Sequence, residues 1–243
     1  MRRLRSHSAQ RTAILTFLFL AFLAVAAAQP QQPDEPSVIR GVDAAIKARF
    51  EAVLGFTVIE HYVVFRGNDE THPAAEMTVK TTYSKDTGKS YTVLSESGSD
   101  IVRHFVLDAL LESEKRINEP ANREASWFTS ANYEMKLQPG GIQRVDGRDC
   151  LAVELNPRRE GPSLIRGTMW VDAKDFSTVE IRGSATKSPS LLTGPAQVMR
   201  QYANVSGFAQ AIHARAVSNS FLLGQTVVII DYQDYKMQLR AEK

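Results

Sequence analysis

Cysteine is nearly absent from this chain, since Cys150 is the only one among 243 residues. A single cysteine cannot form an intrachain disulfide, and it supplies neither a CxxC motif nor a thiolate zinc cluster. The composition, 43% hydrophobic and 23% charged, is that of a globular protein and excludes whole-chain disorder, collagen-like repeats and a disulfide scaffold. The default interpretation of Cys150 is a small buried hydrophobic side chain, with a reactive thiol or an intermolecular disulfide as the alternative.

Linear motifs for catalysis are also lacking. No GxGxxG or Walker loop occurs, and the segment 95–98 (SESG) is not a GxSxG nucleophile elbow. Four histidines follow residue 28, and no two of them have the spacing of a metal-ligand pair: His61, His72, His104 and His213. The sequence therefore predicts a protein that is not an enzyme and that has no metal or other cofactor. The alternative is an enzyme whose catalytic residues are scattered along the chain.

Acidic residues are missing from residues 1–28, and this biases the net charge. The whole chain has 29 basic and 27 acidic side chains, which gives +2. Four of the 29 basic residues are arginines within residues 1–28, so the remainder of the chain has a charge of −2. A weakly acidic domain lacks the basic patch of nucleic-acid-binding proteins, and no nucleic-acid partner is expected.

Residues 1–28 have the three parts of a secretory signal peptide. An arginine-containing start is followed by the apolar run 13–25 (AILTFLFLAFLAV) and by three alanines at 26–28. The run is shorter than the ~20 apolar residues that span a membrane. Cleavage near Ala28 is therefore expected, with an uncleaved anchor as the alternative. No cysteine lies near this site, so no lipid anchor is expected, and the mature protein is predicted to lie outside the cytoplasm.

The rest of the chain divides into a linker and one domain. Residues 29–36 (QPQQPDEP) are polar and rich in proline, which predicts a linker. Residues 37–243 have the length of a single domain. Apolar residues at three-four spacing predict a helix over 38–54 that ends at Gly55, and a second helix over 101–114 with Asp100 as its cap.

Most of the remaining sequence alternates between apolar and polar residues, which is typical of half-buried strands. The segment 76–83 is an example, because Met77, Val79, Thr81 and Tyr83 share one face. Short turns containing Gly, Pro, Asn or Asp join the strands, which favours antiparallel pairing. We therefore predict an α+β domain: one strongly curved antiparallel sheet of about nine to eleven strands, with two to three helices on its apolar face.

One stretch of the sequence is similar to a known family. Residues 145–150 (VDGRDC) lead into an apolar strand, residues 166–172 (RGTMWVD) follow, and the chain later reaches 231–235 (DYQDY). This pattern resembles the LolA/LolB/RseB superfamily of outer-membrane lipoprotein-sorting and lipid-sensing periplasmic proteins, in an uncharacterised bacterial branch. The resemblance spans roughly residues 40–240. It implies a half-open β-barrel, a periplasmic location, and a concave apolar face that shelters acyl chains beneath helices.

Such a site needs no catalytic group, because each buried CH₂ of an acyl chain contributes about 0.8 kcal/mol. A filled hydrophobic core is the alternative for this face. The candidate residues of the cavity and of its helical cover are Ile59, Val63, Phe65, Met77, Val79, Tyr83, Phe105, Leu107, Leu110, Leu111, Met135, Leu137, Met169, Val171, Val179 and Ile181.

The resemblance leaves two functions open. The first is a monomeric carrier or chaperone whose partners are the acyl chains of lipids or lipoproteins. The second is an envelope-stress sensing or regulatory module of the RseB type, which needs an inner- or outer-membrane protein as its partner.

Overall fold

The structure is a computed structural model that describes residues 33–67, 69–187, 194–220 and 224–241. The predicted signal peptide, residues 1–28, and residues 29–32 of the predicted linker lie outside the described residues. In the described part of the chain, no helix is long and apolar enough to cross a membrane.

Helix α1 (Glu35–Ala52) begins earlier than the sequence predicts. Pro36 lies in its first turn, where a proline costs no helical hydrogen bond, so the last two residues of the predicted linker are helical. The prediction that Gly55 ends this helix is wrong, because strand β1 begins at Val53. Gly55 lies within β1, where a Cβ atom would be 2.8 Å from the carbonyl oxygen of Tyr83 on the next strand. This glycine therefore permits a close strand contact.

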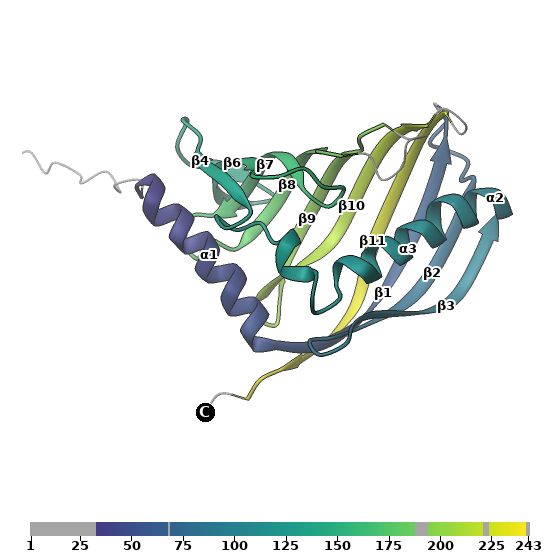
Figure 1. Cartoon of the computed structure of the whole chain (residues 1–243), viewed down its shortest axis with the longest axis horizontal. Coiled ribbons are helices and arrows are strands. Elements are labelled where there is room, and N and C mark those ends of the chain that lie inside the picture. The colour runs from purple at the N-terminus through teal and green to yellow at the C-terminus, as the bar shows by residue number, and fades with distance from the viewer. Residues whose placement is uncertain (1–32, 68, 188–193, 221–223, 242–243) are drawn as a thin grey trace, which may run out of the picture. The chain divides into compact units, whose positions relative to one another are not determined.

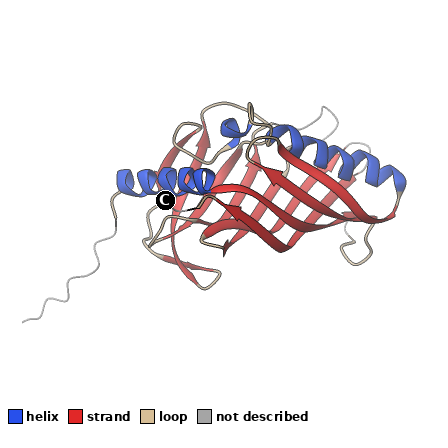
Figure 2. Cartoon of the chain, turned by 90° about the horizontal axis from the view of Figure 1, so that it is seen from below, coloured by secondary structure: helices blue, strands red, loops and turns tan. Residues whose placement is uncertain are grey.

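The eleven strands of the described residues form one antiparallel sheet, which confirms the predicted fold class. In spatial order the sheet runs β3-β2-β1-β11-β10-β9-β8-β7-β6-β4, and β5 pairs with β6, so the sheet is not closed (Figure 1). Figure 2 shows its curvature. The strands are β1 (Val53–Arg66), β2 (Ala75–Ser84), β3 (Gly88–Gly98), β4 (Tyr133–Leu137), β5 (Gln143–Val145), β6 (Arg148–Pro157), β7 (Ile165–Asp172), β8 (Thr178–Ala185), β9 (Gln197–Val205), β10 (Phe208–Ser220) and β11 (Gly224–Leu239).

A glycine pair marks a close approach between two of these strands. Gly167 of β7 lies opposite Gly183 of β8. A Cβ atom on Gly167 would lie 2.1 Å from the carbonyl oxygen of Arg182, and one on Gly183 would lie 2.3 Å from that of Arg166. Side chains are thus excluded at both positions, and glycine pairs of this kind let a sheet bend.

A second helical region crosses the sheet in front of β1 and β2 (Figure 1). It consists of α2 (Asp100–Val102), the π-helical turn η1 (Arg103–Asp108) and α3 (Ala109–Ile117), and we call residues 100–117 the covering segment. The predicted helix over 101–114 is confirmed. Its cap is Ser99 rather than Asp100, because the Ser99 hydroxyl accepts a hydrogen bond from the amide of Val102. A short 3₁₀ helix, η2 (Arg123–Ser126), follows.

The helices divide the hydrophobic core into two clusters. In the first, Val38 and Val42 of α1 pack against residues of β4, β6, β7 and β8. In the second, Val102, Leu107 and Leu111 of the covering segment pack against residues of β1, β2, β10 and β11. We call these the α1 cluster and the covering cluster. They lie at opposite ends of the same sheet face, which we call the inner face.

Candidate ligand-binding site

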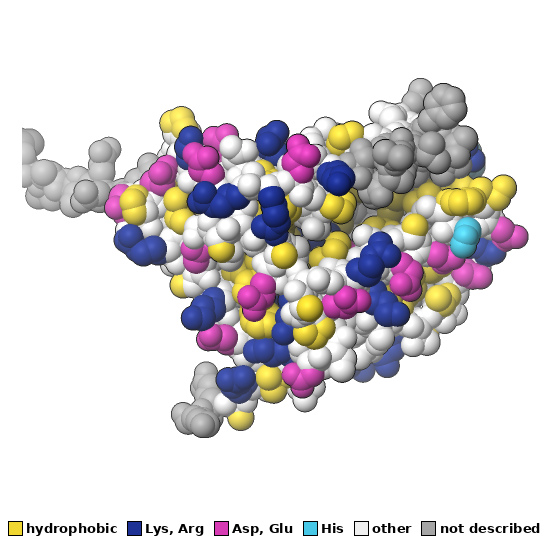
Figure 3. Space-filling view, viewed as in Figure 1, with side chains coloured by type: hydrophobic (Ala, Val, Ile, Leu, Met, Phe, Trp, Pro, Cys, Tyr) yellow, Lys and Arg dark blue, Asp and Glu magenta, His cyan; other side chains and the backbone are white. Residues whose placement is uncertain are grey.

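The inner face between the two clusters is formed by small and partly exposed side chains. Val198 of β9, Ala216 of β10 and Val228 of β11 lie in one row across the sheet. All three are partly exposed; Val198 packs against the α1 cluster, and Val228 packs against the covering cluster. Figure 3 shows hydrophobic side chains along the covering segment on this side of the molecule. We call the row of Val198, Ala216 and Val228, between the two clusters on the inner face, the trough.

A buried network of charged side chains lies beside the trough. Glu114, near the end of α3, forms an ion pair with Lys89 of β3, and both side chains are only 13% exposed. The other carboxylate oxygen of Glu114 lies 3.8 Å from Nη2 of Arg200 on β9. Strands β3 and β9 are separated in the sheet by β2, β1, β11 and β10. Glu114 therefore ties the covering segment to two distant strands.

A second carboxylate, that of Glu60, lies on the inner face of β1. Glu60 is 1% exposed, and so is Tyr62. Oε2 of Glu60 accepts a hydrogen bond from the hydroxyl of Tyr62. Nearby polar atoms lack partners among the described residues: the hydroxyls of Thr81 and Tyr91, and Nε of Arg200. Buried polar groups are almost always hydrogen-bonded, so these unpaired ones are candidates for contact with water or a ligand.

The charges of this network shift the ionisation of its members. Burial alone would raise the pKa of Glu114, but Lys89 and Arg200 outweigh burial and hold that pKa below its usual value. Burial opposes the charge of Lys89, and Glu114 and Glu60 nevertheless raise its pKa. Burial, followed by the charge of Glu114, raises the pKa of Tyr62 and Tyr91 well above the usual tyrosine value. Glu114 and Lys89 thus form an ion pair at neutral pH.

The structure places most of the predicted cavity residues in the two clusters. Met77, Val79, Leu107 and Leu111 belong to the covering cluster, and Leu110 packs against it. Met135, Met169, Val171 and Ile181 belong to the α1 cluster, and Leu137 packs against it.

Two further predicted residues lie on strands beside these clusters. Tyr83 stacks on Phe56, with 5.0 Å between ring centroids. Val179 is buried where the β7–β8 register shifts.

Four predicted residues lie elsewhere. Ile59, Val63 and Phe65 share the face of β1 opposite to Val58, Tyr62 and Val64, which are the residues that contact the covering segment. The structure therefore does not bring these three together with the others. Ile59 instead helps to line a separate pocket of about 520 Å³ with Lys80 and Lys236. Phe105 belongs to the covering segment but is 66% exposed.

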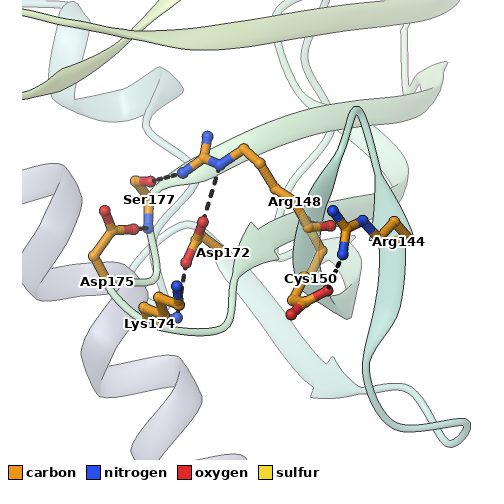
Figure 4. Close-up of polar contacts among 8 residues, drawn as sticks. Arg144, Arg148, Cys150, Asp172, Lys174, Asp175 and Ser177 are labelled. Atoms are coloured by element: carbon orange, nitrogen blue, oxygen red, sulfur yellow. Dashed lines mark hydrogen bonds and ion pairs between the residues drawn. The ribbon is translucent and has the colours of Figure 1, made fainter.

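Residues 145–178, which carry the family resemblance, contain a set of polar contacts around Arg148 (Figure 4). Arg148 donates two hydrogen bonds of 2.9 Å, from Nε to Asp172 and from Nη2 to Ser177. These bonds hold the β7–β8 turn, where Phe176 has φ 57°. Phe176 packs against the α1 cluster, and its ring lies directly over Gly41 of α1. In this structure, the motif is part of the scaffold.

We expect Gly41→Ala to destabilise the protein, although alanine is the better helix former by about 1 kcal/mol. The new Cβ atom would lie 2.2 Å from Cδ2 of Phe176, so the ring must move. Overpacking of this kind costs about 1–3 kcal/mol, which urea denaturation can measure. In a Phe176→Ala background the same substitution should stabilise the protein, and destabilisation in both backgrounds would contradict the packing explanation.

Cys150 is fully buried and has a free thiol, as the default interpretation predicts. Burial raises the pKa of its thiol, which keeps it protonated. Within residues 33–67, 69–187, 194–220 and 224–241, no group of three or more His, Cys, Asp or Glu side chains is placed to hold a metal ion.

Solved structures with a similar fold come from bacteria. A LolA superfamily protein from Nitrosomonas europaea is 12% identical, with a TM-score of 0.45, over 84% of this chain and 93% of that one. A putative outer-membrane lipoprotein-sorting protein domain from Vibrio parahaemolyticus is also 12% identical, with a TM-score of 0.45, over 83% of this chain and 93% of that one. A chain of the MucA/MucB complex of Pseudomonas aeruginosa is 11% identical, with a TM-score of 0.27, over 81% of this chain and 93% of that one. No family model matches the chain, and no curated protein matches it by sequence. At these identities, the similarity concerns the fold alone.

Proposed function

We propose that this protein is a non-catalytic binding protein of the bacterial envelope, which shelters the acyl chain of a lipid or lipoprotein. The chain lies in the trough, between the sheet and the covering segment. Export through the predicted signal peptide at 1–28 places the domain 37–243 in the periplasm. The observation that carries the proposal is the row of Val198, Ala216 and Val228 between the two clusters, whose apolar side chains are only partly buried on the inner face.

The energetics favour an acyl chain as the ligand. Each CH₂ group that leaves water contributes about 0.8 kcal/mol, so a chain of modest length binds without any specific polar contact. Leu110 and Val106 of the covering segment are only partly buried against the covering cluster, and they face the same side of the sheet. An acyl chain in the trough would complete their burial.

An interaction module is the second candidate, and one feature of the surface favours it. Ile101 and Phe105 of the covering segment are 61% and 66% exposed, and Val93 and Leu94 of the edge strand β3 are 48% and 54% exposed. Apolar side chains exposed at a sheet edge are typical of contacts with another protein. A pull-down from envelope extract compares the unmodified protein with Phe105→Ala. If no envelope protein is captured by the unmodified protein and lost with the variant, this candidate is contradicted.

Ala216→Phe is expected to weaken the binding of an acyl probe. The phenyl ring would fill the trough between Val198 and Val228, while the scaffold on either side keeps its own contacts. Fluorescence titration with cis-parinaric acid measures the effect, and a loss of affinity of about tenfold or more is expected, because each 1.4 kcal/mol of lost burial is a factor of ten.

The matched control is Val217→Phe. Val217 is the next residue of β10 and faces the opposite side of the sheet, where it lies beside Val227. This variant should bind the probe as the unmodified protein does. Equal binding by all three proteins, or no binding by the unmodified protein, would refute the proposed function.

A further inference from the structure

The ion pairs around Glu114 have the form of an anion site that the protein occupies with its own carboxylate. Lys89 and Arg200 extend from strands β3 and β9 toward the same group. Glu114 belongs to the covering segment, whose buried apolar side chains Val102, Leu107 and Leu111 pack in the covering cluster. The anion is therefore carried by a helical segment that lies on the sheet, and the two cations are carried by strands of the sheet.

Arg200 is only partly satisfied by Glu114. Its Nη2 lies 3.8 Å from the carboxylate, which is longer than a charge-assisted hydrogen bond of 2.7–2.9 Å. Its Nε has no partner in the described part of the chain, and its side chain is 34% exposed. The Tyr202 side chain also hydrogen-bonds to the guanidinium group. A guanidinium group whose donors are not all paired can bind a second anion in the bidentate geometry that carboxylates and phosphates prefer.

Two unpaired hydroxyls lie close to the same network. Thr81 is fully buried and lies opposite Tyr91 of β3. Among the residues that the structure describes, neither Oγ1 of Thr81 nor the hydroxyl of Tyr91 has a hydrogen-bond partner. Burial, and after it the charges of Glu114 and Glu60, raise the pKa of Tyr91. These hydroxyls can donate hydrogen bonds to a bound anion.

The trough begins beside Arg200. On β9, Val198 lies two residues away on the same face, and Ala214 of β10 is the cross-strand partner of Arg200. A ligand whose charged end contacts Arg200 can therefore extend an apolar chain over Val198 and Ala216. The polar network and the trough have the arrangement that an amphiphile requires.

From these contacts we infer that Lys89 and Arg200 bind the anionic end of an amphiphilic ligand, a carboxylate or a phosphate, in place of the Glu114 carboxylate. This inference rests on the proposed function and adds the chemical class of the ligand. Glu114 moves into solvent when the ligand anion takes its position, and the covering segment loses its tie to β3 and β9. Ligand binding and release of the segment's C-terminal end are thus coupled.

The test compares ligands that share one oleoyl chain and differ at the head. Oleate carries a carboxylate, oleoyl lysophosphatidic acid a phosphate and methyl oleate no charge; inorganic phosphate carries the anion without the chain. Displacement of cis-parinaric acid gives the four affinities. Oleate or the lysophosphatidic acid should bind about tenfold or more tightly than methyl oleate, because charge-assisted hydrogen bonds are the strong ones. The tighter of the two identifies the head group, and inorganic phosphate should compete only weakly.

Two variants assign this preference to the network. Arg200→Gln should bind oleate and methyl oleate equally, because it removes the guanidinium and leaves the trough. Glu114→Gln should bind oleate several-fold more tightly than the unmodified protein, because the competing carboxylate is gone. Lys115→Gln is the matched control, since Lys115 is adjacent to Glu114 but 53% exposed and paired with Glu112. It should leave all affinities unchanged.

The outcomes separate failure of the anion site from failure of the proposed function. No head-group preference, or a preference that survives in Arg200→Gln, overturns the anion site and leaves acyl binding intact. If no acyl ligand binds, the proposed function and this inference both fail. If Glu114→Gln does not fold, hydrogen exchange is measured on the unmodified protein instead of the affinity of this variant. Oleate should then speed exchange of the amides at 114–118, methyl oleate should not, and identical exchange with both ligands would contradict the inference.

Discussion

Glu114→Ala is expected to lower the free energy of unfolding by about 3–5 kcal/mol, the usual cost of removing one partner from a buried ion pair. Glu114 and Lys89 are both nearly inaccessible, and loss of the carboxylate would leave the ammonium of Lys89 buried without its counter-charge. Desolvation of an unpaired charge dominates this cost, and the lost attraction contributes less. Urea denaturation measures the change directly.

A second variant separates these two contributions. Replacing Lys89 and Glu114 together, as Lys89→Met with Glu114→Leu, removes both charges of the pair. Buried ion pairs replaced by apolar side chains of similar volume often lose little stability, so the double variant should be more stable than Glu114→Ala. If the single and double variants lose the same free energy, desolvation of Lys89 is not the cause.

The same pair gives a pH dependence with a defined sign. The pKa of Glu114 is lower in the folded protein than its usual value of 4.5, so the folded state favours the carboxylate. Its stabilisation is fully present above about pH 4.5 and is lost as the pH falls through the folded-state pKa. The difference in stability between the unmodified protein and Glu114→Ala should therefore shrink between pH 7 and pH 3. A constant difference would contradict the assignment.

Leu107→Ala is expected to cost about 2–5 kcal/mol, since Leu107 is fully buried in the covering cluster. It lies in the π-helical turn, midway along the covering segment. The cavity left by truncation would weaken the contact between the segment and strands β1 and β2. Urea denaturation should show the loss, and hydrogen exchange should show faster exchange over residues 100–117 than over the strands.

Phe105→Ala is the matched control, because Phe105 belongs to the same turn and is 66% exposed. Exposed substitutions usually change stability by less than about 0.5 kcal/mol. The two variants therefore remove large apolar side chains from one turn with opposite expectations. Similar losses in both would show that the segment does not pack on the sheet through Leu107.

The sheet could be predicted because alternation survives in most strands. On β2 the inner face carries Met77 and Val79 while Glu76 and Lys80 face outward, so the period of two is clear. The start of β1 was harder, because the helical spacing of α1 continues into Val53. Val53 is part of the strand because it pairs with Leu239 of β11. The two residues are 186 positions apart, so the sequence around Val53 contains no indication of this pairing.

The orientation of β1 could not be derived from alternation. Its outer face carries Ile59, Val63 and Phe65, so both faces of the strand are apolar. The inner face carries the charged residue Glu60, which alternation assigns to solvent. Glu60 is nevertheless buried, because Tyr62 donates a hydrogen bond to it. A carboxylate among apolar inner-face residues is the kind of exception that functional sites produce.

The charged network was missed for the same reason. Lys89, Glu114 and Arg200 are separated by up to 111 positions and resemble ordinary surface residues in the sequence. Only the folded structure shows that β3 and β9, which four strands separate in the sheet, both reach Glu114 of the covering segment. The one signal in the sequence is that Glu114 ends an apolar helical pattern on the face that carries Leu107 and Leu111.

Photo-crosslinking with a diazirine fatty acid, followed by peptide mass spectrometry, tests acyl binding on the inner face most directly. If the ligand lies in the trough, crosslinks will form with peptides that contain Val198, Ala216 or Leu110, and excess oleate will suppress them. Crosslinks confined to the outer-face residues Ile59 and Val63, or crosslinks that oleate does not suppress, would contradict binding of an acyl chain between the sheet and the covering segment.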